Sequence, residues 1–337
     1  MPSFTALGLP DLLAGVVVIA LTAYVLLGGA DFGGGVWDLM AGGPRQERQR
    51  GLIAHAIAPV WEANHVWLIL VIVLLFTCFP AAFSRLTITL HIPLSLLLVG
   101  IVLRGSAFIF RSYAPDDSTG QRRWGRVFAT ASLLTPILLG VSLGAIATGQ
   151  VEPPTGNSFV ADFVAPWATP FSASVGLFTL TLFAFIAAVY LTLEAKESDL
   201  KEDFRLRALV AGALVFVAAL VTLVLAWWES PLVWRGLTAS AHAVPVHLFT
   251  GIAAIAAFWG LWSRRYRMAR VATAAQVIGI LWGWALAQYP YMVPPELTIN
   301  DAAAPAITLR LTAIALAVGA VVLLPSLAYL FRVFKSH

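Results

Sequence analysis

Two ionisable side chains stand three residues apart at the start of a long apolar run. Glu62 and His65 lie within the segment Trp61–Trp67, which the apolar residues of Leu68–Phe79 follow. Residues three apart on a helix share one face, so the carboxylate and the imidazole are expected side by side. Carboxylates and histidines relay protons in membranes because their pKa values can be tuned toward neutrality. The segment therefore favours proton transfer within a membrane.

A second acidic residue extends this site. Asp31 lies in the glycine-rich stretch Gly28–Asp38, at the inner end of the first apolar segment. The second apolar segment begins near His55 at its inner end. Glu62 follows seven residues later, so it lies roughly 10 Å from that end of the helix at 1.5 Å per residue. Asp31, Glu62 and His65 could therefore form a ladder from the cytoplasm toward the middle of the membrane. The alternatives are a helix-capping role or an interfacial position for Asp31, and a structural hydrogen bond from His65 to a backbone carbonyl.

Arg104 offers a competing role for the carboxylates. It interrupts an apolar run, and an arginine inside a membrane usually pairs with a carboxylate. A pair with Glu62 or Asp31 would favour the charged carboxylate and weaken its case as a proton carrier. Both interpretations remain open. Three further residues belong to this candidate ion pair or to a subunit interface, with ordinary packing favoured for the tryptophans: Trp61, Asn64 and Trp67.

Composition indicates a polytopic membrane protein. Hydrophobic residues make up 60% and charged residues 11% of the 337 residues, whereas soluble domains carry about 25% charged residues. The net charge of +4 does not predict nucleic-acid binding, because the basic residues lie in short runs between apolar segments. The single cysteine, Cys78, excludes an internal disulfide and a CxxC metal site. No basic region precedes the first apolar segment, so a cleaved signal peptide is not expected.

Nine apolar segments are predicted to span the membrane as helices, which makes the fold class all-α. They cover residues 10–30, 55–79, 88–110, 127–149, 171–193, 208–228, 243–262, 271–288 and 308–331. The loops after the first, third, fifth and seventh segments, with the C-terminal tail, hold 17 of the 21 Lys and Arg residues. The positive-inside rule therefore predicts the N-terminus outside and the C-terminus in the cytoplasm.

We expect two four-helix bundles followed by one extra helix. The first bundle covers residues 1–150, the second covers 151–290, and the ninth helix with the tail covers 291–337. A short echo between Ala23–Leu27 and Ala188–Thr192 fits an internal repeat. Chance similarity between apolar helices explains that echo about equally well.

The quoted motifs resemble subunit II of the cytochrome bd-type quinol oxidases. The family's first-helix motif, Gly-x-Asp-Phe/Leu-Gly-x-Gly, matches Gly29–Gly35, and its second-helix signature, Trp-Asp/Glu-x-Asn-x-Val-Trp-Leu, matches Trp61–Leu68. A third match comprises Leu103, Arg104, Gly105, Phe108, Phe110 and Arg111. Order, spacing, length and topology agree over the whole chain, while the specific motifs cover mainly residues 24–111.

The resemblance implies a terminal oxidase of the bacterial inner membrane that reduces dioxygen to water with electrons from quinol. In this family subunit I carries the haems, b and d or b only, so no haem ligand and no metal ligand is expected in this chain. Subunit II has a fold similar to that of subunit I, packs against it and contributes to proton supply. A small single-helix accessory subunit, membrane lipid and a structural quinone are further candidate partners.

Two departures from the family pattern bear on the site. Many members carry Asp at the position of Glu62, and many carry an acidic residue where Ile109 stands. The chain resembles divergent, cyanide-insensitive-type members as much as standard ones. The electron donor therefore stays open between ubiquinol and menaquinol, with a c-type cytochrome as a minority alternative. The competing function is a stand-alone proton- or cation-coupled transporter, motivated by the ionisable residues within the spans.

Overall fold

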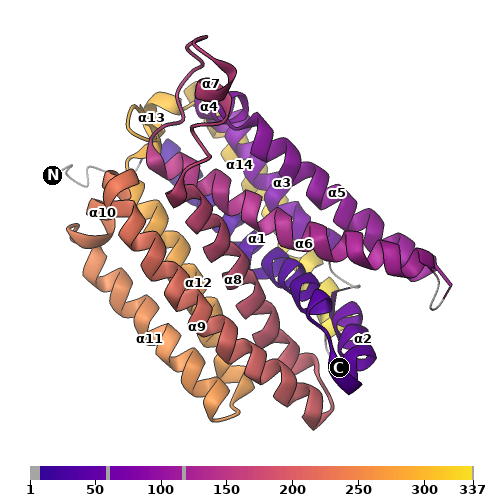
Figure 1. The fold of residues 1–337 in the computed structure, drawn as a ribbon. Coiled ribbons are helices and arrows are strands. Elements are labelled where there is room, and N and C mark those ends of the chain that lie inside the picture. Colours follow the sequence, from indigo (N-terminus) through magenta and orange to yellow (C-terminus); the bar gives the residue numbers. More distant parts are fainter. Residues whose placement is uncertain (1–7, 58–60, 116–118, 336–337) are drawn as a thin grey trace.

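The computed structural model describes residues 8–57, 61–115 and 119–335, and this part of the chain is almost entirely helical (Figure 1). Eight helices in it are long and apolar enough to cross a membrane. They are α1 (Leu9–Leu39), α5 (His91–Tyr113), α6 (Thr119–Thr148), α8 (Pro170–Glu194), α9 (Ser198–Glu229), α11 (Ala243–Trp262), α12 (Tyr266–Gln288) and α14 (Ala306–Lys335). The predicted all-α, polytopic class is thereby confirmed.

A ninth span would consist of two helices rather than one. The short turn η1 (Gly43–Arg45) leads into α2 (Gln46–Ile57), and α3 (Trp61–Cys78) follows. The two helices are bent by 52°, so the predicted segment 55–79 is not one straight helix. The residues that join them, 58–60, lie outside the described part. The break follows composition, because α2 carries charged and polar side chains whereas α3 is apolar.

The first helix also differs from its prediction. It continues past residue 30 to Leu39, because the glycine-rich stretch stays helical and buried. Asp31 therefore lies inside α1, about two turns before its end, and not at the helix terminus. The helix-capping interpretation of Asp31 is wrong.

Close packing through glycine explains this extension. A Cβ atom on Gly33 would lie 2.0 Å from the carbonyl oxygen of Phe183 on α8. A Cβ on Gly35 would lie 2.2 Å from Oγ of Ser132 on α6. Only residues without a side chain allow helices to approach so closely. The side chain of Trp37 completes the contact, since its Nε1 donates a 2.7 Å hydrogen bond to the carbonyl of Ala184.

The helices α1 and α8 run through the middle of the bundle, with α3, α5 and α6 on one side and α9, α11 and α12 on the other (Figure 1). One buried hydrophobic core contains residues from both predicted halves, such as Phe32, Phe128, Phe183 and Ala257. The division into bundles at residues 150 and 290 therefore stays a prediction. No residue in the apolar window of α14 is buried.

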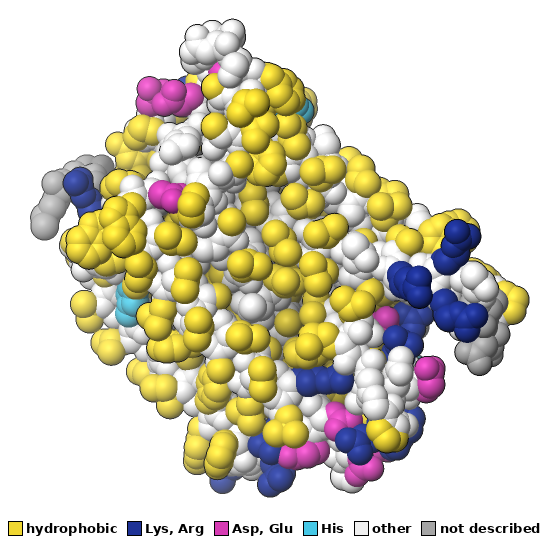
Figure 2. All heavy atoms as spheres, viewed as in Figure 1, with side chains coloured by type: hydrophobic (Ala, Val, Ile, Leu, Met, Phe, Trp, Pro, Cys, Tyr) yellow, Lys and Arg dark blue, Asp and Glu magenta, His cyan; other side chains and the backbone are white. Residues whose placement is uncertain are grey.

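Short elements occupy the connections at the ends of the bundle. They are α4 (Pro80–Thr89), α7 (Phe159–Phe163), α10 (Pro231–Thr238), α13 (Ile299–Ala302) and the antiparallel strands β1 (Tyr291–Val293) and β2 (Leu297–Thr298). α4, α7 and α13 cap one end, whereas α2 lies at the other (Figure 1). Most Lys and Arg side chains on the visible face gather at the end with α2 (Figure 2). This asymmetry agrees with the predicted topology, whose direction remains a prediction.

Candidate functional site

Three buried polar side chains meet where α1, α3 and α5 pack together. Asp31, Asn64 and Arg104 are only 5%, 2% and 2% exposed, and we call them the polar cluster. Nδ2 of Asn64 donates a 2.6 Å hydrogen bond to Oδ2 of Asp31. A buried carboxylate is costly without such donors and countercharges. Two of the predicted site residues are thus joined directly.

Arg104 lies in an aromatic and hydroxyl environment within this cluster. Its Nε donates to Oγ of Ser132 at 3.2 Å, and its guanidinium lies 4.7 Å from the ring centroid of Phe32 and 5.3 Å from that of Phe128. The charge of Asp31 interacts favourably with the guanidinium. Cation–π contacts and a nearby carboxylate together offset the loss of hydration of a buried arginine. Asp31 is therefore the acidic residue of this cluster that stabilises Arg104.

His65 also faces α1. Its ring lies 5.9 Å from that of Tyr24 and 6.1 Å from that of Phe32, measured between centroids. Tyr24 is 1% exposed, and its hydroxyl has no hydrogen-bond partner among the described residues. The imidazole thus lies beside the aromatic residues that surround the polar cluster.

Glu62 occupies a different position from the one its spacing predicts. It is exposed, in the first turn of α3, and lines a surface groove of about 390 Å³ together with residues of α5. The other lining residues are Ile101, Val102, Gly105, Ser106, Ile109 and Phe110. A helix N-terminus stabilises a carboxylate through its backbone dipole. Glu62 is therefore not a buried carboxylate within this chain, and it presents its charge to an apolar outer surface.

The structure describes the side chain of only one of the two tryptophans in the segment Trp61–Trp67. Trp67 packs against the main core, and its Nε1 is buried without an acceptor among the described residues. Trp61 begins α3, but its side chain lies outside the described part of the structure. Ordinary packing, which was the favoured interpretation, accounts for Trp67.

A partly buried ion pair near the end of α1 was not predicted. Nη1 and Nη2 of Arg111 donate to the two carboxylate oxygens of Asp38 at 2.9 and 3.2 Å, and Asp38 is 4% exposed. Asp38 ends the glycine-rich stretch and Arg111 belongs to the third motif match, but nothing in their spacing indicated that they pair. Ser132 and Phe128, which contact Arg104, carried no sequence signal at all.

A second network joins the turn before α2 to α9. Arg45 donates to both oxygens of Asp203, at 2.9 and 2.6 Å, and Gln49 donates to the same carboxylate at 2.8 Å. Gln49 accepts in turn from Arg207 at 2.8 Å. The hydrogen bonds that Arg45 donates to Asp203 are the main cause of the raised pKa of the Arg45 guanidinium. These contacts hold α2 against the basic end of the bundle.

The arrangement of acidic, histidine and cysteine side chains bears on metal and haem ligation. Among the described residues, no group of three or more His, Cys, Asp or Glu side chains is arranged to hold a metal ion. Nδ1 of His91 lies 2.9 Å from the carbonyl oxygen of Ile88, and Nδ1 of His247 lies 2.7 Å from that of Ala243. These histidines thus have local backbone partners near the ends of their helices.

Comparison with known proteins supports the resemblance found in the motifs. The family model described as cytochrome bd terminal oxidase subunit II matches residues 9–334. A Bacillus subtilis protein, "putative cytochrome bd menaquinol oxidase subunit II", is 24% identical over 92% of this chain and 91% of its own length. The Escherichia coli "cytochrome bd-I ubiquinol oxidase subunit 2" is 26% identical over 63% of this chain and 53% of its own length.

The fold agrees with a solved structure as well. A chain in "the structure of bd oxidase from Geobacillus thermodenitrificans" superposes with a TM-score of 0.81 at 24% identity, covering 97% of this chain and 98% of that one. A stand-alone transporter is not favoured by these matches. The chain belongs to the cytochrome bd terminal oxidase subunit II family and is a multi-pass protein of the bacterial inner membrane.

Proposed function

We propose that this chain supplies cytoplasmic protons to a haem-bearing partner, subunit I, in a complex that reduces dioxygen to water with electrons from quinol. The haems, b and d or b only, would lie in that partner. One observation carries the proposal: α3 holds a buried amide bonded to Asp31 and, two residues earlier, an exposed carboxylate. The helix thus links the interior of this chain to its outer surface.

Asp31 is the interior proton carrier in this proposal. Its carboxylate can hold a proton on one oxygen while Oδ2 accepts from Nδ2 of Asn64. The amide would keep the carboxyl oriented in both protonation states, because it donates to the same oxygen throughout. Arg104 would stabilise the deprotonated state, since its charge interacts favourably with Asp31. Asp31 would therefore stay deprotonated between transfers and hold a proton only transiently before passing it on.

Glu62 is the exit group of the route. An exposed carboxylate on the apolar surface of a membrane protein requires a polar partner or water beside it. The groove that Glu62 lines is bordered by α5 residues such as Ile101 and Ile109, and we propose that subunit I covers it. Glu62 would then pass protons across the subunit contact. His65, packed beside Tyr24 and Phe32, would line the route between Asp31 and Glu62.

The names of the relatives support a quinol as the electron donor. Their names specify a menaquinol oxidase in one case and a ubiquinol oxidase in others. We propose a quinol donor that binds mainly to subunit I, with a c-type cytochrome as the alternative for a divergent member. A structural quinone and a small single-helix subunit are further proposed components of the complex.

The route is tested in the assembled complex with Glu62→Gln, Glu62→Asp and Asp31→Asn. We expect Glu62→Gln and Asp31→Asn to reduce oxygen consumption at least ten-fold, in line with the loss of a proton-transfer group (about 10²–10⁴-fold). Glu62→Asp should keep most of the activity because it retains a carboxylate. The haem absorbance per complex should stay at the wild-type level in all three.

Two outcomes would contradict the proposal. Wild-type turnover in assembled Glu62→Gln complexes would remove Glu62 from the route. Loss of haem or of subunit I in that variant would instead make Glu62 a structural contact. Comparing oxygen consumption with quinol and with reduced c-type cytochrome as donors distinguishes the two electron sources in the same preparations.

A further inference from the structure

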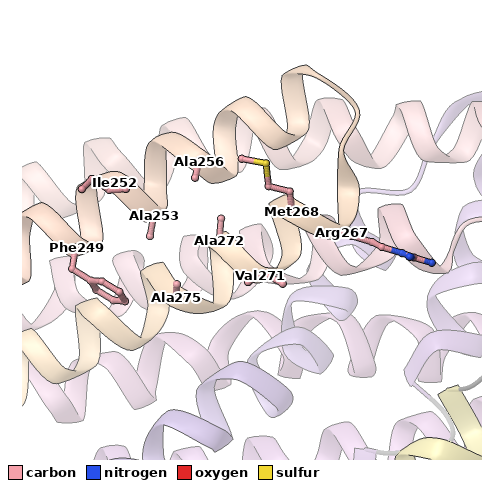
Figure 3. Close-up of a pocket in the computed structure, with 9 residues that line it drawn as sticks. All are labelled: Phe249, Ile252, Ala253, Ala256, Arg267, Met268, Val271, Ala272 and Ala275. Carbon is pink, nitrogen blue, oxygen red and sulfur yellow. The ribbon is translucent and has the colours of Figure 1, made fainter.

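A long apolar groove lies on the outer face of the α11–α12 hairpin, away from the polar cluster. It has a volume of about 590 Å³. Figure 3 shows the side chains that line it. Its lining residues come from one face of each helix: Phe249, Ile252, Ala253 and Ala256 from α11, and Arg267, Met268, Val271, Ala272 and Ala275 from α12. The groove is independent of the proposed proton route.

Small side chains create the groove between two larger walls. Ala253 and Ala272 form its floor and are 6% and 8% exposed, whereas Ile252 and Val271 stand at its rim and are 66% and 71% exposed. From Phe249 to Ala256 the floor extends roughly 10 Å along the helix at 1.5 Å per residue. Apart from one arginine, the lining is entirely apolar. This shape and chemistry suit a hydrocarbon chain.

One end of the groove carries a positive charge. Arg267 lies at the end beside the turn between the helices, and Phe249 lies at the opposite end (Figure 3). Neighbouring arginines already have partners: Arg264 lies 3.5 Å from a Glu202 oxygen, and Arg270 lies 4.8 Å from the ring centroid of Tyr190. Arg267 is exposed and forms no ion pair within the described part of the chain.

Aromatic residues mark the level of this end in the membrane. Trp259 and Trp262, in the last turn of α11, are 52% and 74% exposed. The guanidinium of Arg265 lies 5.1 Å from the ring centroid of Trp259. Exposed tryptophans concentrate at the headgroup level of a bilayer, where arginines meet anionic lipids. The groove therefore runs from the headgroup level at Arg267 into the hydrocarbon region.

We propose that this groove is a binding site for one anionic phospholipid. An acyl chain would lie on Ala253 and Ala272, and the phosphate would lie against Arg267. Charge complementarity selects the headgroup, because Arg267 has no carboxylate partner in the described chain. The apolar lining with one basic residue at its end suits an acyl chain that is joined to a phosphate.

Photocrosslinking in the purified oxidase complex tests the proposal. The complex is reconstituted in phosphatidylcholine nanodiscs with a phosphatidylglycerol that carries a diazirine in its acyl chain. After illumination, we expect crosslinks on peptides of α11 and α12, which unlabelled phosphatidylglycerol removes and phosphatidylcholine does not. Arg267→Gln should weaken this competition about five-fold, the effect of one basic residue near a membrane surface. Ala256→Leu should abolish the crosslinks by filling the groove.

Arg332→Gln is the matched control, because Arg332 is an exposed arginine of α14 that lines neither described pocket. Equal competition by unlabelled phosphatidylglycerol in the Arg267→Gln and Arg332→Gln variants would overturn the site. So would equal competition by phosphatidylcholine, or crosslinks carried by a protein subunit seated on the hairpin. Competition by inorganic phosphate as strong as by phosphatidylglycerol would assign Arg267 to a free anion instead. The surface variant Arg267→Gln decides the question even if Ala256→Leu does not assemble.

Discussion

Asn64 and Asp31, 33 residues apart in the sequence, share a 2.6 Å hydrogen bond that joins α3 to α1. The bond places a neutral donor beside a buried carboxylate, with Arg104 as the nearby positive charge. Glu62, two residues before Asn64, lies on the opposite face of α3 and is exposed. A single helix therefore contributes to the interior and to the outer face of the site, which makes the Asn64 bond the first contact to test.

Asn64→Leu should destabilise the complex. The substitution keeps the approximate size of the side chain but removes the hydrogen bond that Asn64 donates to the Asp31 carboxylate, at a cost of about 1–3 kcal/mol. Thermal unfolding of the purified complex, followed by intrinsic fluorescence, should show a lowered midpoint. The control is Asn300→Leu, at an exposed position in α13. An unchanged midpoint for Asn64→Leu would mean that another group satisfies Asp31.

Arg104→Met should have the largest effect on assembly. It removes the positive charge beside Asp31, and breaking a buried charge interaction costs about 3–5 kcal/mol. Arg104→Lys retains the charge but loses the planar contact with Phe32, so its effect should be smaller. The amount of haem-containing complex extracted from membranes measures both. Arg310→Met, at an exposed position of α14, is the control. Full assembly of Arg104→Met would show that the cluster is not needed for folding.

The predicted topology is tested by cysteine labelling in intact cells. Asn157→Cys lies in the loop before α7, and Ser198→Cys begins α9 at the basic end of the bundle. Both positions are exposed, whereas native Cys78 is fully buried. A membrane-impermeant maleimide should label Asn157→Cys only, because basic loops remain in the cytoplasm. Labelling of Ser198→Cys alone would reverse the orientation and place the Asp31 side of the route outside.

Helix positions were largely predictable because bilayer thickness sets the length of an apolar run. The segment 243–262 coincides with α11, and 171–193 differs from α8 by one residue at each end. Helix ends were less predictable where packing decides them. α1 continues to Leu39 because Gly33 and Gly35 fit against α8 and α6, and such contacts between distant segments leave no local pattern.

The site was predictable in its residue types but not in its geometry. Asp31, Asn64 and Arg104 were all candidates, and they are buried together. The outward position of Glu62 was not foreseen, because a three-residue spacing fixes relative direction along one helix and not which side meets a neighbour. Ser132 likewise became visible as a partner of Arg104 only once α6 was placed beside α5.

Gly33→Ala should weaken the contact between α1 and α8. The added Cβ would lie 2.0 Å from the Phe183 carbonyl oxygen and 2.7 Å from Cβ of Ala187, so the helices must separate. Overpacking of this kind costs about 1–3 kcal/mol. Gly15→Ala is the matched control on the same helix, because its Cβ would meet nothing within 4 Å. The control should be neutral or stabilising by up to about 1 kcal/mol, since alanine favours helix more than glycine. Thermal unfolding midpoints of the two complexes decide the matter: equal midpoints would show that α1 and α8 tolerate a wider separation, and that the glycine run serves some purpose other than close packing.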